Sequence, residues 1–190
     1  YTLGTDGLRR IITSDLTAEA GHDVAPSYLP DGRIVFSSTR QRQSKAVLLD
    51  EGKAQFDAQD EDRNEPAFVL HVMNDDGSDI HQVSFNQSHD LDPTVLTNGQ
   101  VLFSRWDNAA GNNELNLYRM NPDGRGLELY YGSESHDTGT SGATVQFVQP
   151  REMPDGRILT IVRPFQTAEA GGDLVAIDGQ NFVENLQPVA

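Results

Sequence analysis

Apolar residues occur along this chain in short runs that alternate with polar residues and are separated by turns containing glycine. Examples are the runs at 33–37, 101–104 and 115–120, which are rich in Ile, Val, Leu, Phe and Tyr. Such runs, bounded by Asp-Gly or Asn-Gly turns, are typical of β-hairpins. The 17 glycines and 9 prolines leave no long window with helical periodicity, so only 45–56 is predicted to form a short helix.

The same order of segments occurs three times. Each copy begins with a His-Asp pair and continues through a short apolar stretch, a turn and an apolar strand. The copies read GHDVAPSYLPDGRIVFSSTR, SHDLDPTVLTNGQVLFSRWD and SHDTGTSGATVQFVQPREMPDGRILTIVRPF. A second predicted hairpin follows each copy, which gives four strands per unit, and the opening YTLGTDGLRRIITS matches this second hairpin alone. Four-stranded units repeating at roughly 40–50 residues are typical of propeller blades.

The repeats predict an all-β fold, a β-propeller segment of four-stranded antiparallel blades. It comprises a half blade at 1–20 and complete blades at 21–87, 88–134 and 135–190, with a polar, acidic insertion at 41–65. A four-stranded sheet cannot cover both of its own faces, and propellers typically have 4–8 blades. We therefore expect the chain to be part of a larger ring, and the opening Tyr1 in place of an initiator Met agrees with a piece of a longer protein.

The charge of the chain narrows the classes of partner. There are 14 basic and 29 acidic side chains, a formal net charge of −15, which disfavours binding to nucleic acid or anionic lipid. No apolar stretch is long enough for insertion into a membrane. The chain is instead expected to associate, in a salt-sensitive way, with a basic protein such as a cationic cytochrome, or with the remaining propeller blades.

Two resemblances sharpen this interpretation. The segments PSYLPDGRIVFSS and VMNDDGSDIHQVS resemble the WD-like repeats of Tol-type propellers. The run that begins SHDLDPTVLTNGQVLFSRWD and continues to ILTIVRPF is similar to the propeller of hydrazine synthase alpha-subunit-like proteins. The second resemblance implies a periplasmic or extracellular location and a parent protein whose c-type haems lie in other domains. Because the chain has no cysteine, no haem-attachment motif occurs in it, and no cofactor is expected here.

The repeated His-Asp pairs are the candidate binding residues. They are His22, Asp23, His89, Asp90, His136 and Asp137. Each pair is predicted at the start of the first strand of its unit, around one end of the ring. Imidazoles and carboxylates gathered there could hold Zn²⁺ or a similar cation. In the alternative, which the repetition favours, each Asp caps a turn and each His joins neighbouring strands by hydrogen bonds.

Other polar residues are given structural interpretations. Arg40, Arg105 and Arg163 are predicted to be surface guanidinium groups paired with carboxylates, because their distances from the preceding turn glycine differ. Trp106 and Asp107 are predicted to provide packing and a polar tip.

Three further segments are acidic or rich in small residues. The acidic segment 74–79 does not fit a calcium loop, since the required first and twelfth positions are valines, and it is predicted to be a hairpin turn. The loop 137–143 lacks the lysine of a phosphate-binding loop. The insertion 41–65 is either a solvated acidic loop or a surface for partner docking.

Three functions remain open. The first is a non-catalytic propeller scaffold in a hydrazine synthase alpha-like, haem-bearing periplasmic protein. The second is a Tol-type module that binds peptides or partner domains. The third is a metal-dependent enzyme with a His/Asp site at the channel mouth. Catalysis is the least favoured, because no serine stands in a G-x-S-x-G context.

Overall fold

Antiparallel β-sheets make up nearly all of the regular structure in the computed structural model. The structure describes residues 2–4, 7–9, 21–54, 58–59, 66–108, 111, 113–164 and 171–179. Within these residues the strands form a small hairpin and three larger sheets, here named sheets I, II and III in chain order.

Each of the larger sheets is a meander in which consecutive strands pair. The hairpin consists of β1 (Thr2–Gly4) and β2 (Gly7–Arg9). Sheet I consists of β3 (Asp23–Tyr28), β4 (Ile34–Ser38), β5 (Val69–Met73) and β6 (His81–Gln82). Sheet II consists of β7 (Asp90–Val95), β8 (Val101–Asp107), β9 (Glu114–Met120) and β10 (Glu128–Tyr131). Sheet III consists of β11 (Val145–Glu152), β12 (Ile158–Pro164) and β13 (Asp173–Ile177).

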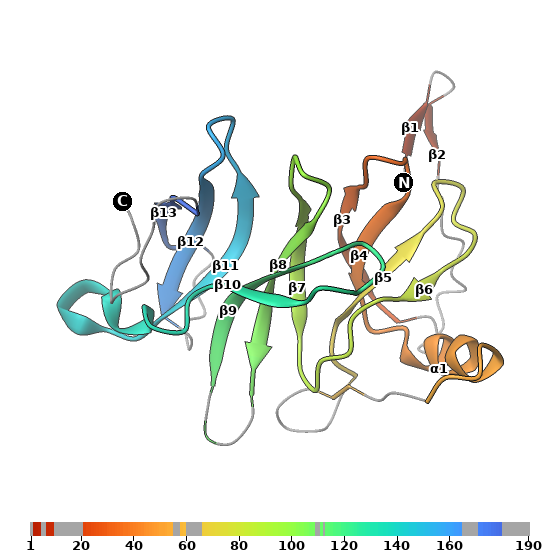
Figure 1. Cartoon of the computed structure of the whole chain (residues 1–190), viewed down its shortest axis with the longest axis horizontal. Helices are drawn as coiled ribbons and strands as arrows, with labels where there is room; N and C mark the ends of the chain where they lie inside the picture. The colour runs from red at the N-terminus through yellow and green to blue at the C-terminus, as the bar shows by residue number, and fades with distance from the viewer. Residues whose placement is uncertain are drawn as a thin grey trace.

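The three sheets lie side by side, and their first strands β3, β7 and β11 are neighbours (Figure 1). Two hydrophobic clusters fill the spaces between them. One contains Val35 and Leu70 of sheet I with Phe103 of sheet II, and the other contains Leu117 of sheet II with Phe147 of sheet III. Apolar packing between the faces of four-stranded antiparallel sheets whose first strands meet is the arrangement of propeller blades, so the predicted fold class is confirmed.

A bulge with an unusual backbone conformation recurs in the first strand of every sheet. Ala25, Asp92 and Gln149 have positive φ angles of 51°, 53° and 53°, and each precedes a proline. The pairing with the second strand shifts register at the same place in all three sheets. Non-glycine residues adopt positive φ at a cost in energy, so this shared feature identifies equivalent positions in the three units.

The insertion in the first complete blade differs from the prediction. It begins with the helix α1 (Gln41–Asp50), which lies beside sheet I near β6, whereas 45–56 was the predicted helix (Figure 1). Leu48 of this helix is buried, so this part of the insertion packs against the protein instead of forming a solvated loop. The helix starts earlier than predicted, and only two residues separate it from β4.

Parts of two predicted units lie outside the residues that the structure describes. The fourth strand expected in the blade at 135–190 and most of the half blade at 1–20 lie outside the described residues. The segment 74–79 does form a turn, in which Gly77 donates its backbone N–H to Asn74. None of the helices in the described part of the chain is long and apolar enough to cross a membrane.

Candidate functional site

Two of the candidate aspartates form ion pairs with arginine; the pair of Asp90 is buried, and that of Asp23 is partly exposed. Asp90 accepts hydrogen bonds from Arg105 at 2.8 and 3.0 Å, and Asp23 accepts two from Arg40 and one from the Ser38 hydroxyl. The pairing agrees with the sequence prediction, but the surface location predicted for Arg40 and Arg105 is wrong, since both are buried. Both aspartates therefore hold strand pairs together.

The histidines that precede these aspartates differ in environment. His22 is exposed, and its backbone pairs with Thr39. The ring of His89 stacks on Trp106 with centroids 5.5 Å apart, and its Nδ1 accepts a hydrogen bond from the backbone N–H of Phe68 at 3.0 Å. His89 thus joins the residue before β5 of sheet I to the start of sheet II.

The third pair does not stand at the start of a strand. His136 and Asp137 lie in a short 3₁₀ turn, His136–Thr138, well before β11. The recurring bulge places Phe147, not Asp137, at the position that Asp23 and Asp90 occupy. The insertion of the loop 137–143 in this unit displaces the pair from the strand. Asp137 is exposed and accepts a hydrogen bond from Thr144 at 3.3 Å.

The structure does not bring the three pairs into one centre. No group of three or more His, Asp or Glu side chains that could hold a metal ion occurs among the residues that the structure describes. The arginines paired with Asp23 and Asp90 occupy the oxygens that a metal would need.

A pocket of about 490 Å³ lies where sheets I and II meet, at the end of sheet II where β8 ends and β9 begins. Its wall consists of the loop 85–88, which leads into β7, the adjoining ends of β8 and β9, and β10 with the residues that follow it. The lining residues are Phe85, Asn86, Gln87, Ser88, Asp107, Asn108, Glu114, Asn116, Tyr118, Leu129 and Ser133. We call this cavity the Asp107 pocket.

Hydrogen bonds fix the walls of the Asp107 pocket. Asp107 Oδ2 accepts from Asn116 Nδ2 at 2.8 Å and from the Tyr118 hydroxyl at 3.0 Å. Asn116 Oδ1 lies 2.8 Å from His136 Nε2, and the carboxylate of Glu114 lies 3.7 Å from the same nitrogen. Because Asn116 donates to Asp107 through Nδ2, its Oδ1 faces His136 and accepts that hydrogen bond. His136 is therefore part of the support of this pocket.

Hydrogen bonds also fix the loop 85–88. Asn86 Nδ2 donates to the backbone carbonyl oxygens of His89 at 3.2 Å and of Trp106 at 3.0 Å. Trp106 in turn donates from its indole nitrogen to Asn113 at 2.7 Å. Tyr118 is partly buried, and this burial, together with the neighbouring carboxylate of Asp107, raises the pKa of its phenol to about 12. The pocket thus has a preformed wall and a phenol that stays protonated.

Sequence reasoning did not single out most of this pocket. Asp107 was interpreted as a polar tip, whereas it accepts two hydrogen bonds at the centre of the wall. Glu114, Tyr118 and Ser88 were not considered. One signal was present: Arg40, two residues beyond the partner of Asp23, is replaced by the acidic Asp107 at the corresponding place in sheet II. A residue that differs from its equivalent in another unit is not required by the structure common to all units, so it is available for a separate role.

Solved structures of other proteins are similar to this chain. The chain is similar to hydrazine synthase from Kuenenia stuttgartiensis, with a TM-score of 0.65 and 18% identity over 94% of this chain and 27% of that one. It is also similar to a chain from Agrobacterium tumefaciens assigned as TolB, with a TM-score of 0.49 and 12% identity over 82% of this chain and 48% of that one. No family model and no curated protein matches the chain.

The similarity to hydrazine synthase agrees with the β-propeller fold and shows nothing finer. The chain spans about a quarter of the hydrazine synthase chain, as the coverage of 27% shows.

Proposed function

We propose that this chain is a non-catalytic β-propeller segment that presents binding surfaces within a larger periplasmic or extracellular protein of the hydrazine synthase alpha-like kind. The likeness to hydrazine synthase, which extends over 94% of this chain, supports this proposal. Any c-type haem of such a parent would lie in other domains, because the present sequence contains no cysteine.

The proposal rests on one observation: the candidate reactive groups are hydrogen-bonded or ion-paired within the protein. Asp90 is buried against Arg105, and His136 is buried between Asn116 and the backbone carbonyl of Val145. Groups held in this way stabilise contacts between strands and sheets, and they are not positioned for acid-base or nucleophilic chemistry on a substrate. A scaffold role is therefore favoured over the enzyme hypothesis.

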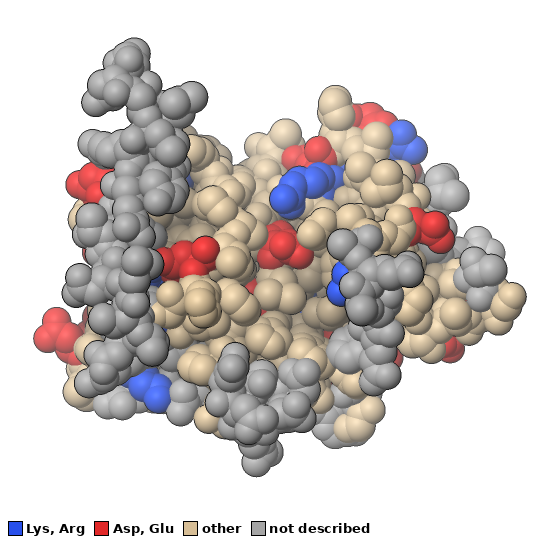
Figure 2. All heavy atoms as spheres, turned by 180° about the vertical axis from the view of Figure 1, so that it is seen from behind, with Lys and Arg blue, Asp and Glu red and all other residues tan. Residues whose placement is uncertain are grey.

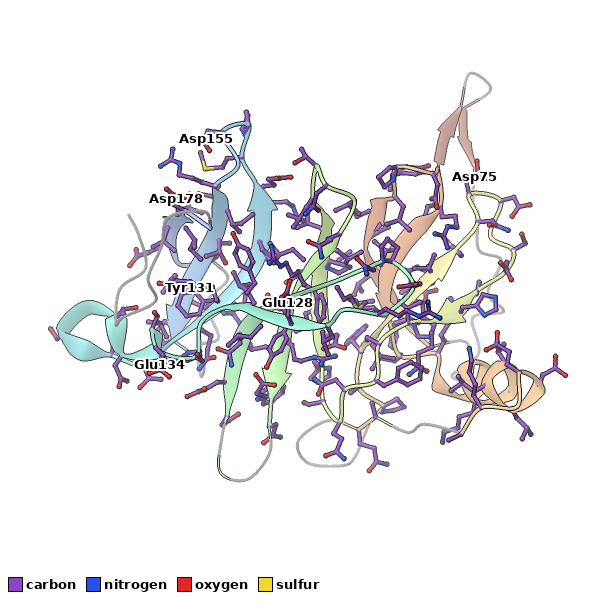
Figure 3. The ribbon with its side chains drawn as sticks, viewed as in Figure 1. Asp75, Glu128, Tyr131, Glu134, Asp155 and Asp178 are labelled. Carbon is purple, nitrogen blue, oxygen red and sulfur yellow. The ribbon has the colours of Figure 1, made fainter. Side chains whose placement is uncertain are left out.

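The outer edge of sheet II is the surface best suited to a protein partner. Phe85 and Leu129, both of which line the Asp107 pocket, are 49% and 41% exposed. Acidic side chains also occur along this edge: Figure 3 places Glu128, which pairs with Arg119, on β10 and Glu134 in the segment that follows it. An acidic and apolar surface is complementary to a basic partner with an apolar centre, such as a cationic cytochrome.

The face of the molecule behind the view of Figure 1 shows no continuous basic surface among the described residues. In Figure 2 the Lys and Arg side chains appear as small separate groups among acidic and uncharged residues. The formal net charge of −15 belongs to the whole chain, so its field adds to the local acidity of the sheet II edge.

Binding of a basic c-type cytochrome to the purified chain tests the proposal. We expect association that weakens at least about tenfold between roughly 10 and 150 mM salt, as the Debye length falls from about 30 to about 8 Å. Phe85→Ser and Leu129→Ser should each weaken it further. Leu174→Ser, which removes an apolar side chain that is 66% exposed on β13 of sheet III, is the matched control and should have no effect. Binding that is equally strong at both salt concentrations would contradict the proposal.

A further inference from the structure

The hydrogen-bonding groups in the wall of the Asp107 pocket are unevenly used. Several donors are already occupied within the protein: Asn116 Nδ2 and the Tyr118 hydroxyl donate to Asp107, and Asn86 Nδ2 donates to two backbone carbonyls. The acceptors are not. Asp107 Oδ1 and the Asn86 side-chain oxygen have no hydrogen-bond partner among the residues that the structure describes. The charged groups of the wall, Asp107 and Glu114, are therefore acceptors only, whereas the neutral amides of Gln87 and Asn108 can donate or accept.

Two carboxylates face each other in this wall. Asp107 and Glu114 are direct cross-strand partners at the ends of β8 and β9, and both line the pocket. Like charges directly opposite each other destabilise a pair of strands, unless a positive group lies between or beside them. Arg105 is bonded through two nitrogens to Asp90, and His136 Nε2 lies 2.8 Å from Asn116 Oδ1 and 3.7 Å from the carboxylate of Glu114. No Lys or Arg side chain lines the pocket itself among the described residues.

Ser88 provides a second, separate sign of a ligand. This residue belongs to the pocket wall and is 2% exposed, yet within the described part of the chain its hydroxyl has no hydrogen-bond partner. A buried hydroxyl without a partner is unfavourable, and a bound ligand or water would supply the missing hydrogen bond. The orphan hydroxyl and the facing carboxylates thus occur in one cavity.

We propose that the Asp107 pocket binds an organic cation, an alkyl guanidinium or ammonium group, with its N–H groups on Asp107 and Glu114. The apolar stem of such a ligand would lie along Phe85, Leu129 and the ring of Tyr118, which supply the apolar part of the wall. A bare metal ion is a poorer match, because the described residues of the pocket supply two carboxylates and no histidine or further acid. An anion would meet two negative charges with no unpaired cation. This inference goes beyond the scaffold role and does not depend on it.

Titration of the isotope-labelled chain with butylguanidinium, followed by NMR, tests the inference. The amide signals of the pocket wall should shift saturably, and the neutral isostere butylurea should bind at least about tenfold more weakly, since hydrogen bonds to charged groups are worth about 1.5–3 kcal/mol. Equal binding of butylurea, or shifts centred elsewhere on the protein, would overturn the proposal.

Two charge-neutralising variants locate the site. Glu114→Gln and Asp107→Asn should each weaken butylguanidinium binding about tenfold or more. The Glu114 variant leaves the hydrogen bonds of Asp107 intact and so keeps the test valid if Asp107→Asn fails to fold. The matched control is Asp155→Asn, which removes one carboxylate at the β11–β12 turn, at the opposite end of the sheets (Figure 3). Unchanged binding to Glu114→Gln would overturn the proposal.

The source of the cation is decided by a further comparison. A short peptide that contains one arginine is titrated beside butylguanidinium. Tighter binding of the peptide identifies the side chain of a partner polypeptide as the ligand, and equal or weaker binding identifies a free amine or guanidine. Both results support recognition of the same group. Cytochrome association, which tests the scaffold role, is measured separately, so failure of either proposal is recognised independently of the other.

Discussion

Asp90 and Arg105 are direct cross-strand partners on β7 and β8, and their side chains form a two-point ion pair inside the molecule. The guanidinium also lies over the rings of Phe103 and Tyr118, at 5.5 and 5.2 Å from their centroids. The charge of Arg105 is therefore compensated by one carboxylate and two aromatic faces.

Loss of the Asp90 carboxylate should be strongly destabilising. In Asp90→Asn the buried guanidinium of Arg105 loses its counter-charge, and we expect the free energy of unfolding to fall by about 3–5 kcal/mol in urea denaturation. Asp31→Asn, which weakens the exposed pair of Asp31 and Arg33, is the control and should cost at most about 1 kcal/mol. The double variant Asp90→Leu, Arg105→Met should recover most of the loss, because neither charge remains buried alone.

This ion pair illustrates what the sequence could and could not predict about the fold. Alternating apolar runs and Asp-Gly turns predicted the strands, the hairpins and the repeat, because these depend on neighbouring residues. Burial of Arg40 and Arg105 could not be predicted in the same way. Their distances from the turn glycine differ, yet the register of β3 with β4 and of β7 with β8 brings both guanidinium groups to the same aspartate position. A long arginine side chain spans that two-residue difference.

The candidate site was harder to predict for a related reason. The His-Asp pairs stood out because they recur, and recurrence in a repeat protein follows from a structural requirement of each unit. The Asp107 pocket occurs in one sheet only and is assembled from a loop, two strand ends and an edge strand. Such a combination depends on how sheets I and II pack, which no local pattern in the sequence records.

Acid should destabilise the protein through His71. This side chain is fully buried, stacks on Phe36 at 5.7 Å and has its pKa lowered to about 4 by burial. The unfolded chain binds a proton near pH 6.5, the folded one only near pH 4, so between these values the unfolded state holds more protons. Stability should fall by roughly 3 kcal/mol as the pH drops from 7 to 4. In His71→Phe this part of the pH dependence should disappear, whereas His22→Asn, at an exposed histidine, should retain it.

Packing between sheets I and II can be tested at a turn glycine. Gly124, in the β9–β10 turn, has φ +83°, and a Cβ atom there would lie 2.3 Å from the carbonyl oxygen of Val83, just after β6. Gly124→Ala must therefore move backbone at the junction of the two sheets. The control is Gly32→Ala, where φ is +89° and nothing lies within 4 Å of the added atom among the described residues. Both should lose about 1–2 kcal/mol from the backbone conformation, and Gly124→Ala at least about 1 kcal/mol more, as measured by denaturation.

Tyr118 should ionise at a higher pH than an exposed tyrosine, and its ionisation should link the stability of the protein at alkaline pH to the Asp107 pocket. Burial and the adjacent Asp107 raise the pKa of its phenol to about 12. Above pH 10 the unfolded chain has lost this proton while the folded chain keeps it, so the folded state binds more protons and stability falls with rising pH. Burial also raises the pKa of Tyr130, so the measurement compares the size of the late step in phenolate absorbance. This step should shrink by one tyrosine in Tyr118→Phe and keep its full size in Tyr28→Phe, which changes an exposed tyrosine. A late step of unchanged size in Tyr118→Phe would mean that the phenol of Tyr118 is not held by Asp107 as the structure has it.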